Sequence, residues 1–220
     1  MQTEKISNVR AKTKYRLKDG SIVPGVTTVL NVLNKPALVP WANNLGLEGI
    51  SVKQYVDKLA SIGTLAHYLI ECDLREVEPD TTGYSAEEMN LAENCLISYW
   101  EWKKTNNPEP ILTEAKMVSE EYKFGGTIDL YCKINNELWL VDFKTGKAIY
   151  SEMITQLSAY KWLLLENNYK TDKVQILRIG RDETEGFEPQ IKTAEELEPH
   201  WERFKSCLRI YQLNKIIGRE

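Results

Sequence analysis

Two aspartates and a lysine form the clearest chemical pattern in the sequence. Asp129 and Asp142 lie in two segments that are separated only by Asn135-Asn136. If these asparagines form a two-residue type I′ turn, the segments pair as a hairpin and the aspartates face each other, with Cβ atoms roughly 5 Å apart. Lys144 is two residues further along its strand and therefore projects from the same face as Asp142.

The same hairpin has an apolar pattern that fixes its register. Residues 127–134 and 137–144 alternate between polar and apolar side chains, and the face expected to pack on a core carries Ile128, Leu130, Cys132, Ile134, Trp139, Val141 and Phe143. A slip of one residue would turn both aspartates into that core. The sequence therefore predicts that the two carboxylates meet on one face of the sheet.

Two facing carboxylates repel each other, and a hard divalent cation relieves that repulsion. Such ions prefer oxygen ligands, at about 2.1 Å for Mg²⁺. A lysine beside the ion can orient a water or stabilise charge that develops on a phosphate. On spacing alone, a surface hairpin with two solvated aspartates is an equally good interpretation.

Two helical patterns add further candidates. Gly63, His67 and Glu71 have i, i+4, i+8 spacing and share one stripe of a helix, while Gln156 and Tyr160 form an i, i+4 pair on a later helix. Without other context, a structural histidine and an ordinary polar helix edge explain both patterns. Gly125-Gly126, just before Asp129, fits either a simple turn or a close approach of the backbone to a site.

The elements that must position these residues follow a helix-then-strand order. Helices are expected at 52–74, 85–104 (with Ser85 as N-cap) and 151–167, and strands at 111–118, 127–134, 137–144, 173–180 and 187–192. Thr193 and Glu196 have capping-box spacing before a last helix that Pro199 kinks or restarts. Nearer the N-terminus, Asp19-Gly20 predicts a hairpin, and Pro36 and Pro40 interrupt the stretch before a short helix from Trp41. The order predicts an α/β fold, a mixed β-sheet flanked by helices.

Charge is distributed unevenly along the chain. The formal net charge is −4, but residues 1–60 are net positive and the remainder is net negative. Five cations at alternate positions would line one face of an extended segment and follow a phosphate backbone: Arg10, Lys12, Lys14, Arg16 and Lys18. A lysine-protected edge strand or a mobile tail is the alternative. Lys147 and Lys161 could add substrate contacts.

Composition excludes several classes of protein. Hydrophobic residues make up 42% of the 220 residues and charged residues 27%, which is ordinary for a folded domain. No apolar run approaches the ~20 residues that span a bilayer, and we expect no secretory signal because the first ten residues contain no apolar segment. The cysteines at 72, 95, 132 and 207 are far apart in sequence, which indicates free thiols in a reducing cytosol.

Together these residues resemble the ordered motifs of RecB-type nucleases in the PD-(D/E)XK superfamily. The motifs are Gly63-Thr64-Leu65-Ala66-His67, Gly126-Thr127-Ile128-Asp129, Asp142-Phe143-Lys144-Thr145-Gly146 and Gln156-x-x-x-Tyr160. Val23-Pro24-Gly25-Val26-Thr27-Thr28 and Trp41 are also similar to the start of phage-type and mitochondrial exonucleases of that group. The resemblance covers roughly residues 15–180. Ile128 stands where the superfamily motif has proline.

The resemblance implies a restriction-endonuclease-like core and a role for each motif residue. The metal, Mg²⁺ or Mn²⁺, would be bound by Asp129, Asp142, His67 and the backbone carbonyl of Phe143. Lys144 would position the attacking water, and Gln156 and Tyr160 would hold the site and the DNA backbone. Glu114 and Glu71 are weaker candidates for a second metal or a supporting role. No iron–sulfur cluster is expected, because Cys72, Cys95, Cys132 and Cys207 lack the clustering of relatives that carry one.

The resemblance also implies an activity and an organisation for the chain. We expect one nuclease domain over 1–220, with a basic N-terminal hairpin and short helices in 1–50, a catalytic core in 51–192 and a C-terminal helix in 193–220. The expected activity is an exonuclease acting on DNA ends or single strands in recombination, repair or replication. An endonuclease on the same fold and a catalytically silent DNA-binding relative are the alternatives. The expected setting is the cytoplasm of a bacterium or phage-infected cell, without membrane contact and with an open oligomeric state.

Overall fold

The computed structural model describes residues 13–218. Its helices are α1 (Val26–Leu30), α2 (Leu38–Leu47), α3 (Val52–Arg75), α4 (Ala86–Asn106), α5 (Ser151–Glu166) and α6 (Ala194–Ile216). Its strands are β1 (Tyr15–Arg16), β2 (Ile22–Val23), β3 (Glu109–Ser119), β4 (Phe124–Ile134), β5 (Glu137–Lys144), β6 (Lys173–Ile179) and β7 (Phe187–Lys192). Each helix and strand expected from the periodicity is therefore present, with ends shifted by a few residues.

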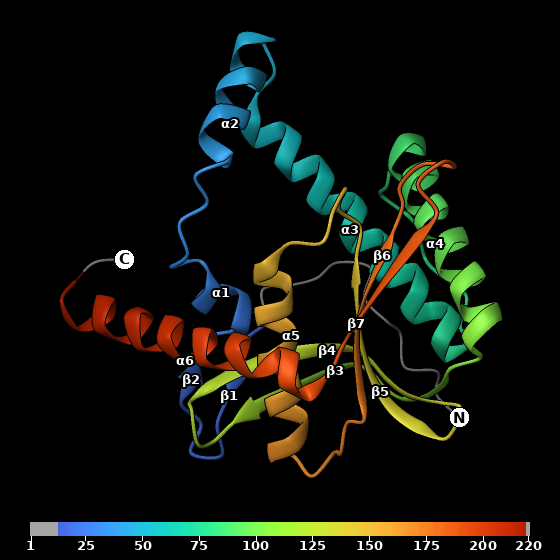
Figure 1. The fold of residues 1–220 in the computed structure, drawn as a ribbon. Coiled ribbons are helices and arrows are strands. Elements are labelled where there is room, and N and C mark those ends of the chain that lie inside the picture. The colour runs from blue at the N-terminus through green and yellow to red at the C-terminus, as the bar shows by residue number, and fades with distance from the viewer. Residues whose placement is uncertain (1–12, 219–220) are drawn as a thin grey trace.

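A five-stranded mixed sheet in the order β3-β4-β5-β6-β7 forms the centre of the fold (Figure 1). β5 and β6 are parallel, and the other neighbours are antiparallel. The parallel pair follows from the connection, because α5 carries the chain from the end of β5 back to the start of β6. The C-terminal ends of β5 and β6 consequently lie side by side at one edge.

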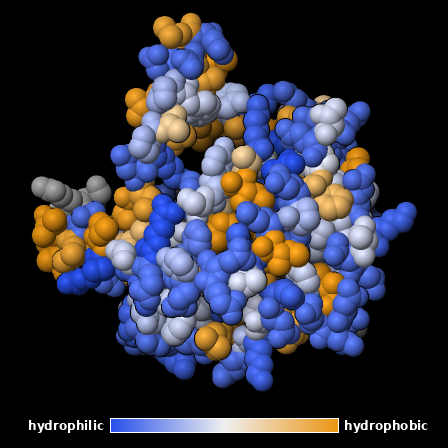
Figure 2. All heavy atoms as spheres, in the orientation of Figure 1, coloured by the Kyte–Doolittle hydropathy of each residue, from blue (hydrophilic) through white to orange (hydrophobic). Residues whose placement is uncertain are grey.

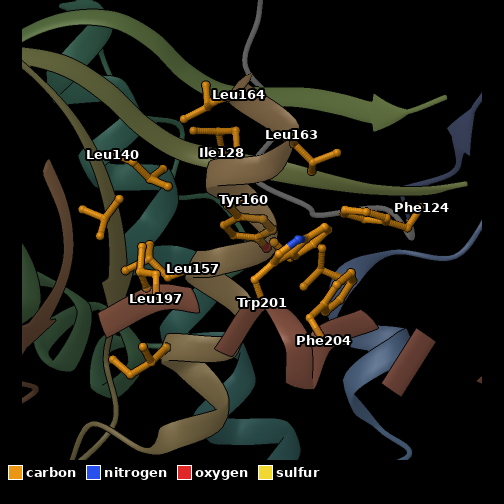
Figure 3. Close-up of a cluster of buried hydrophobic side chains, with 14 of the residues drawn as sticks. Phe124, Ile128, Leu140, Leu157, Tyr160, Leu163, Leu164, Leu197, Trp201 and Phe204 are labelled. Atoms are coloured by element: carbon orange, nitrogen blue, oxygen red, sulfur yellow. The ribbon is translucent and has the colours of Figure 1, made fainter. Parts of the chain in front are cut away.

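Helices cover both faces of the sheet, each over its own apolar core. One core joins α1, α5 and α6 to the sheet and includes Tyr160, Trp201 and Phe204 (Figure 3). The other joins α3 and α4 to the opposite face and includes Tyr99, Trp102 and Phe143. This is the mixed α/β architecture that the sequence predicts.

The β4–β5 hairpin has the predicted turn and register. Asn135 and Asn136 both have positive φ, as a type I′ turn requires, and Leu130 pairs with Val141. One detail of the prediction is wrong. Ile128 packs in the core of α5 and α6, not with Leu130 on the face towards α3 and α4.

The alternation of faces is interrupted at Asp129. In a regular strand, side chains three residues apart point to opposite faces. Ile128 and Tyr131 nevertheless face the same core, so the alternation is broken between them. The interruption turns Asp129 towards α3, as a bulge in a strand redirects a side chain. Both faces of the hairpin are covered by helices, and both aspartates are therefore buried rather than solvated.

Capping residues explain several helix boundaries. Ser85 and Thr193 each form a capping box, with Glu88 and Glu196 respectively. α6 continues through Pro199 without a restart, so that alternative of the prediction is wrong. Leu197, Trp201 and Phe204 on this helix pack in one core with α5 residues, and this packing maintains the helix across the lost hydrogen bond.

The N-terminal part forms a small hairpin followed by a projecting arm. β1 pairs with β2 around Asp19-Gly20, as predicted. α2 begins three residues before Trp41 and includes Pro40, which therefore does not interrupt it; a first-turn proline gives up an N–H that needs no partner in the helix. α2 has no buried residue, and the arm of α2 and the start of α3 stands out from the body in Figure 2. Among residues 13–218, no helix is both long and apolar enough to cross a bilayer.

Candidate active site

The Asp129 carboxylate lies where the pairing of β4 with β5 ends. Leu130 and Val141 are the last residues paired on this side of the hairpin. Beyond them, the backbone N–H of Phe143 donates a 3.0 Å hydrogen bond to Oδ2 of Asp129. The side chain thus continues the ladder in place of a backbone carbonyl, and its orientation is set by the strand that carries Asp142.

Three possible metal ligands meet beside Asp129. Nδ1 of His67 on α3 lies 3.5 Å from Oδ1 of Asp129 and 3.7 Å from Oε1 of Glu114 on β3. One ligand atom from each of these residues lies within 4.8 Å of the other two. The structure therefore brings Glu114 closer to the candidate metal site than the sequence indicates.

The backbone at Glu114 has an uncommon conformation. Its φ is +49°, in the left-handed region that residues other than glycine seldom adopt. Glu114 lies between Thr113 and Ala115, which pair with Leu130 and Ile128, so it stands opposite Asp129. The distortion on one strand and the phase change on the other occur at the same position, where the acidic side chains gather. Such strain is typical of functional sites.

Asp142 and Lys144 form the second part of the site. Nζ of Lys144 lies 2.6 Å from Oδ2 of Asp142, which is almost fully buried. Burial raises the pKa of Asp142 to about 6; the Lys144 charge opposes this increase and the Asp129 charge adds to it. The Lys144 ammonium is the partner of this buried oxygen, and no other hydrogen-bond partner of Oδ2 is found within residues 13–218.

These features fit a bound divalent cation. The group of His67, Glu114 and Asp129 offers two carboxylates and an imidazole, which divalent metals accept as ligands. Asp142 is outside this group of three, yet the charge of Asp129 acts on it, and within residues 13–218 its buried Oδ2 has no hydrogen-bond partner other than Lys144. A cation would compensate the negative charge that burial now makes unfavourable.

Gln156 and Tyr160 form a buried pair on α5, and the charges of both aspartates act on the Tyr160 hydroxyl. Nε2 of Gln156 donates a 2.6 Å hydrogen bond to the Tyr160 hydroxyl, and both side chains are buried. Burial, reinforced by the charges of Asp142 and Asp129, raises the pKa of Tyr160 well above its usual value. The hydroxyl therefore stays protonated and can donate a hydrogen bond towards the acidic site.

The glycine pair allows two tyrosines to approach β4 from opposite sides. A Cβ on Gly126 would lie 2.6 Å from the Tyr160 ring, and a Cβ on Gly125 would lie 2.4 Å from the Tyr15 ring. The Tyr15 hydroxyl is also 2.9 Å from Oγ1 of Thr127. The close approach considered from sequence is therefore an approach of aromatic rings. Tyr15 escaped the sequence analysis because its partners lie more than 100 residues away.

Other predicted site residues have structural contacts. Glu71 forms an ion pair with Arg75 at 2.9 Å and is not in the group around His67. The Phe143 ring packs edge-on against His67, with ring centroids 6.0 Å apart, and so helps to orient the imidazole. The role of the Phe143 carbonyl as a metal ligand stays a prediction.

The basic residues predicted to contact substrate are dispersed. Lys12 lies outside the described residues, and Lys14 and Arg16 are exposed near the start of β1. Arg16 donates to the Gly20 carbonyl and, with Glu120 and Glu166, lines a surface pocket of about 270 Å³. These acidic neighbours make that end of the segment a poor phosphate site.

Lys147 and Lys161 lie near acidic residues of the surface. The charge of Lys147 lowers the pKa of Asp182, although hydrogen bonds from Thr184 lower it more. The charge of Lys161 likewise contributes to the lowered pKa of Glu195, after larger effects of hydrogen bonds at the start of α6. Contact of either lysine with substrate stays a prediction.

The four cysteines are free and buried. Three lie in the core of α3 and α4, and Cys207 lies in the other core. Burial raises the pKa of both Cys95 and Cys132 to about 12, so these thiols stay protonated at neutral pH. Their separation into two cores is compatible with the expected absence of an iron–sulfur cluster, which stays a prediction.

Comparison with known sequences identifies the class of protein. The sequence profile of the PD-(D/E)XK nuclease superfamily matches residues 54–216, most of the chain. The chain therefore belongs to the PD-(D/E)XK nuclease superfamily, as the motifs indicate, and nucleases of this superfamily use divalent metals. No curated protein matches the chain.

Solved structures show only a general likeness. A candidate exonuclease from Eubacterium rectale is 14% identical, with a TM-score of 0.46, over 77% of this chain and 67% of that one. LHK-Exo, an alkaline exonuclease from Laribacter hongkongensis crystallised with dAMP, is 11% identical, with a TM-score of 0.40, over 90% of this chain and 94% of that one.

A third structure, of the protein SSO0001, is 18% identical with a TM-score of 0.35. The match covers 57% of each chain, so this chain spans little more than half of that protein.

Proposed function

We propose that this chain is a metal-dependent deoxyribonuclease that hydrolyses phosphodiester bonds, with exonuclease action on DNA ends or single strands. The observation that carries the proposal is the convergence of His67, Glu114 and Asp129 beside the Asp142–Lys144 pair, at an edge where β4 and β5 separate. A site with several carboxylates and one lysine is suited to binding a divalent metal and hydrolysing a phosphate ester.

The proposed metal is Mg²⁺ or Mn²⁺, held by Asp129, Asp142, His67 and the Phe143 carbonyl, with Glu114 as a further ligand. When bound, the ion lowers the pKa of a coordinated water and stabilises negative charge on the phosphate. The protein residues do the rest: they orient the ligands, exclude solvent and place charge next to the reacting group.

Lys144 has the role of positioning the attacking water. Its side chain is only 19% exposed and its ammonium is anchored to Asp142, so it presents its remaining N–H groups at a fixed place. The protonated Tyr160 hydroxyl, oriented by Gln156, supports the aspartates from the α5 side.

A degradation assay tests the activity. Purified protein is incubated with linear DNA and Mg²⁺, Mn²⁺ or chelator, together with the variants Lys144→Ala and Asp142→Ala. We expect metal-dependent degradation that both variants lose by at least about 100-fold while circular dichroism shows an intact fold. Lys133→Ala is the matched control, because Lys133 lies on β4 outside the site. This variant should degrade DNA at the parental rate. Equal activity of all variants would refute the assignment.

The mode of cleavage needs a second substrate. A circular single strand has no end, so an exonuclease leaves it intact while the same linear strand is degraded. Cleavage of the circle at a comparable rate would support the endonuclease alternative. Failure to bind Mn²⁺ in calorimetry, with DNA binding retained, would support a catalytically silent relative.

The proposed setting is the cytoplasm of a bacterium or phage-infected cell, in recombination, repair or replication. This part of the proposal is supported by the similarity of the N-terminal motif to phage-type exonucleases. Fractionation of bacteria that express the tagged chain tests the compartment, and we expect the chain in the cytoplasmic fraction. Survival of these cells after DNA damage, compared with cells that express the Lys144→Ala variant, tests the process.

A further inference from the structure

A second basic side chain, that of Arg181, lies close to the site. It is near the C-terminal end of β6, the strand next to the one that carries Lys144. Arg181 follows β6 after one residue, Gly180, and β6 runs parallel to β5, so both strands end at the same edge of the sheet. In open α/β sheets, ligands bind at the carboxyl ends of parallel strands. No sequence motif points to this arginine.

The Arg181 guanidinium is connected to the loop after Lys144. Its Nη2 donates a 3.2 Å hydrogen bond to Oγ1 of Thr145, the residue after Lys144. Thr145 is itself buried, and its Oγ1 lies close to Gly63, one turn before His67 on α3. The guanidinium therefore stands beside the loop that joins the lysine to α5.

The same guanidinium lacks the partners that its charge requires. Its Nε is buried and has no hydrogen-bond partner, and within residues 13–218 the group forms one hydrogen bond and no ion pair with a carboxylate. A guanidinium has five N–H donors, and leaving a partly buried one uncompensated is unfavourable. An anion is the missing partner that the geometry requires.

The backbone of Arg181 is held firmly in place. Its N–H donates to the Glu185 carboxylate at 2.9 Å, and its carbonyl accepts from the Asn94 side chain on α4 at 3.0 Å. Gly180 has no room for a side chain, because an added Cβ would lie 2.4 Å from Glu185. The β6–β7 connection is thus built to keep the arginine at this edge.

We propose that Arg181 binds a phosphate of the substrate strand next to the scissile one, with the Thr145 hydroxyl orienting the guanidinium. Arginine is suited to this because its planar fork matches two phosphate oxygens. The proposal rests on the proposed function, since it names a subsite for the same polyanionic substrate. It adds a substrate-binding residue in the β6–β7 connection, outside the four motifs.

Arg178, three residues earlier and on β6, offers a matched control. Its Nε donates to Glu188 at 2.9 Å and its Nη2 to the Glu185 carbonyl at 3.2 Å, so its charge is already neutralised within the protein. Arg178→Gln and Arg181→Gln each remove one positive charge, from β6 and from the connection after it, but only the second removes an N–H donor without a partner within residues 13–218.

The test measures binding of a fluorescein-labelled single-stranded oligonucleotide, by anisotropy, in the Asp142→Asn background with chelator present. We expect Arg181→Gln to weaken binding about tenfold at 50 mM salt and to reduce the slope of log Kd against log salt by about one. Arg178→Gln and Thr145→Val should leave the slope unchanged. Thermal unfolding should show at most a small loss of stability for Arg181→Gln, because within residues 13–218 its guanidinium forms one hydrogen bond and no ion pair with a carboxylate.

Several results would overturn the inference. Affinity and salt slope that equal those of the background would show that Arg181 contacts no phosphate. Lower thermal stability with an unchanged slope, reproduced by Thr145→Val, would show that the arginine only supports the loop. If the Asp142→Asn chain bound no DNA and the unmodified chain degraded none, the proposed function would fail, and this subsite with it.

Discussion

The backbone N–H of Phe143 donates its hydrogen bond to the side chain of Asp129, at 3.0 Å, where a regular hairpin would use a main-chain carbonyl. One acidic residue therefore stabilises the sheet and contributes to the candidate metal site at the same time. It also links the two strands mechanically, because the position of Asp129 depends on the strand that carries Asp142 and Lys144. The site and the end of the hairpin are one structural unit.

Replacement of Asp129 should separate these two roles. Asp129→Ala leaves the Phe143 N–H buried without an acceptor, and we expect it to lower the free energy of unfolding by about 1–3 kcal/mol. Asp129→Asn keeps an acceptor oxygen and should cost less, while both variants lose activity. Urea denaturation followed by fluorescence measures the difference. Equal destabilisation by the two substitutions would show that the hydrogen bond is not important for folding.

Asp142 should make the metal-free protein less stable as the pH rises. Its pKa is about 6 in the folded chain, against an ordinary value of 3.8, so between these values the folded state binds more protons than the unfolded state. Stability from this group is therefore greatest below about pH 4 and is lost as pH rises through 6. Asp142→Asn removes this loss, and we expect it to raise stability by about 1–3 kcal/mol at pH 8.

Thermal unfolding in chelator at several pH values checks this prediction. The advantage of Asp142→Asn over the parent should shrink between pH 7 and pH 4. Saturating Mn²⁺ should reverse the order at pH 8, because the cation binds the parent, which has the additional carboxylate, more tightly than the variant. A constant difference across the pH range would contradict the assignment of the raised pKa to this residue.

Glu114 should contribute to metal binding in spite of its unfavourable backbone. We expect Glu114→Gln to weaken Mn²⁺ binding by about tenfold or more, because it removes one of the two carboxylates in the group around His67. Glu114→Gly should weaken binding similarly and yet raise the melting temperature, because glycine adopts a φ of +49° without strain. Isothermal calorimetry with Mn²⁺ and thermal unfolding measure the two effects.

His67 should influence which metal is bound. Imidazole is a softer ligand than carboxylate, so His67→Ala should reduce affinity for Mn²⁺ more than affinity for Mg²⁺. Competition between the two ions, with Mn²⁺ detected by electron paramagnetic resonance, gives the ratio. An unchanged ratio would place His67 outside the ligand set.

The glycine pair should be intolerant of alanine for steric reasons. Gly126→Ala brings a Cβ within 2.6 Å of the Tyr160 ring and 2.9 Å of Leu163, and we expect a loss of about 1–3 kcal/mol in stability. Gly125→Ala should be similarly unfavourable, and Tyr15→Ala should partly rescue it. Gly46→Ala in α2 meets nothing within 4 Å and should instead stabilise the helix by up to about 1 kcal/mol. Melting temperatures of the four variants decide the matter.

Much of the architecture follows from local sequence. The Asn135-Asn136 turn and the alternation of apolar residues determine the hairpin register, because a slip would exchange two buried faces. Capping boxes at Ser85 and Thr193 mark the starts of α4 and α6. The prediction that Asp129, Asp142 and Lys144 gather at one place depends on these short-range signals alone.

Tertiary structure decided the rest, because it depends on contacts between distant residues. The interrupted alternation of faces at Asp129 and the left-handed backbone of Glu114 occur at the same position of two paired strands. The sequence of either strand by itself predicts neither irregularity. Asp142 is buried because helices cover both faces of the sheet. The two carboxylates are therefore not solvated, as a surface hairpin would leave them, and burial raises the pKa of Asp142. Tyr15 and Arg181 form their hydrogen bonds with Thr127 and Thr145, which are distant in the chain. The position of a residue in the sequence does not reveal which distant residues it contacts, so only the folded structure shows these partners.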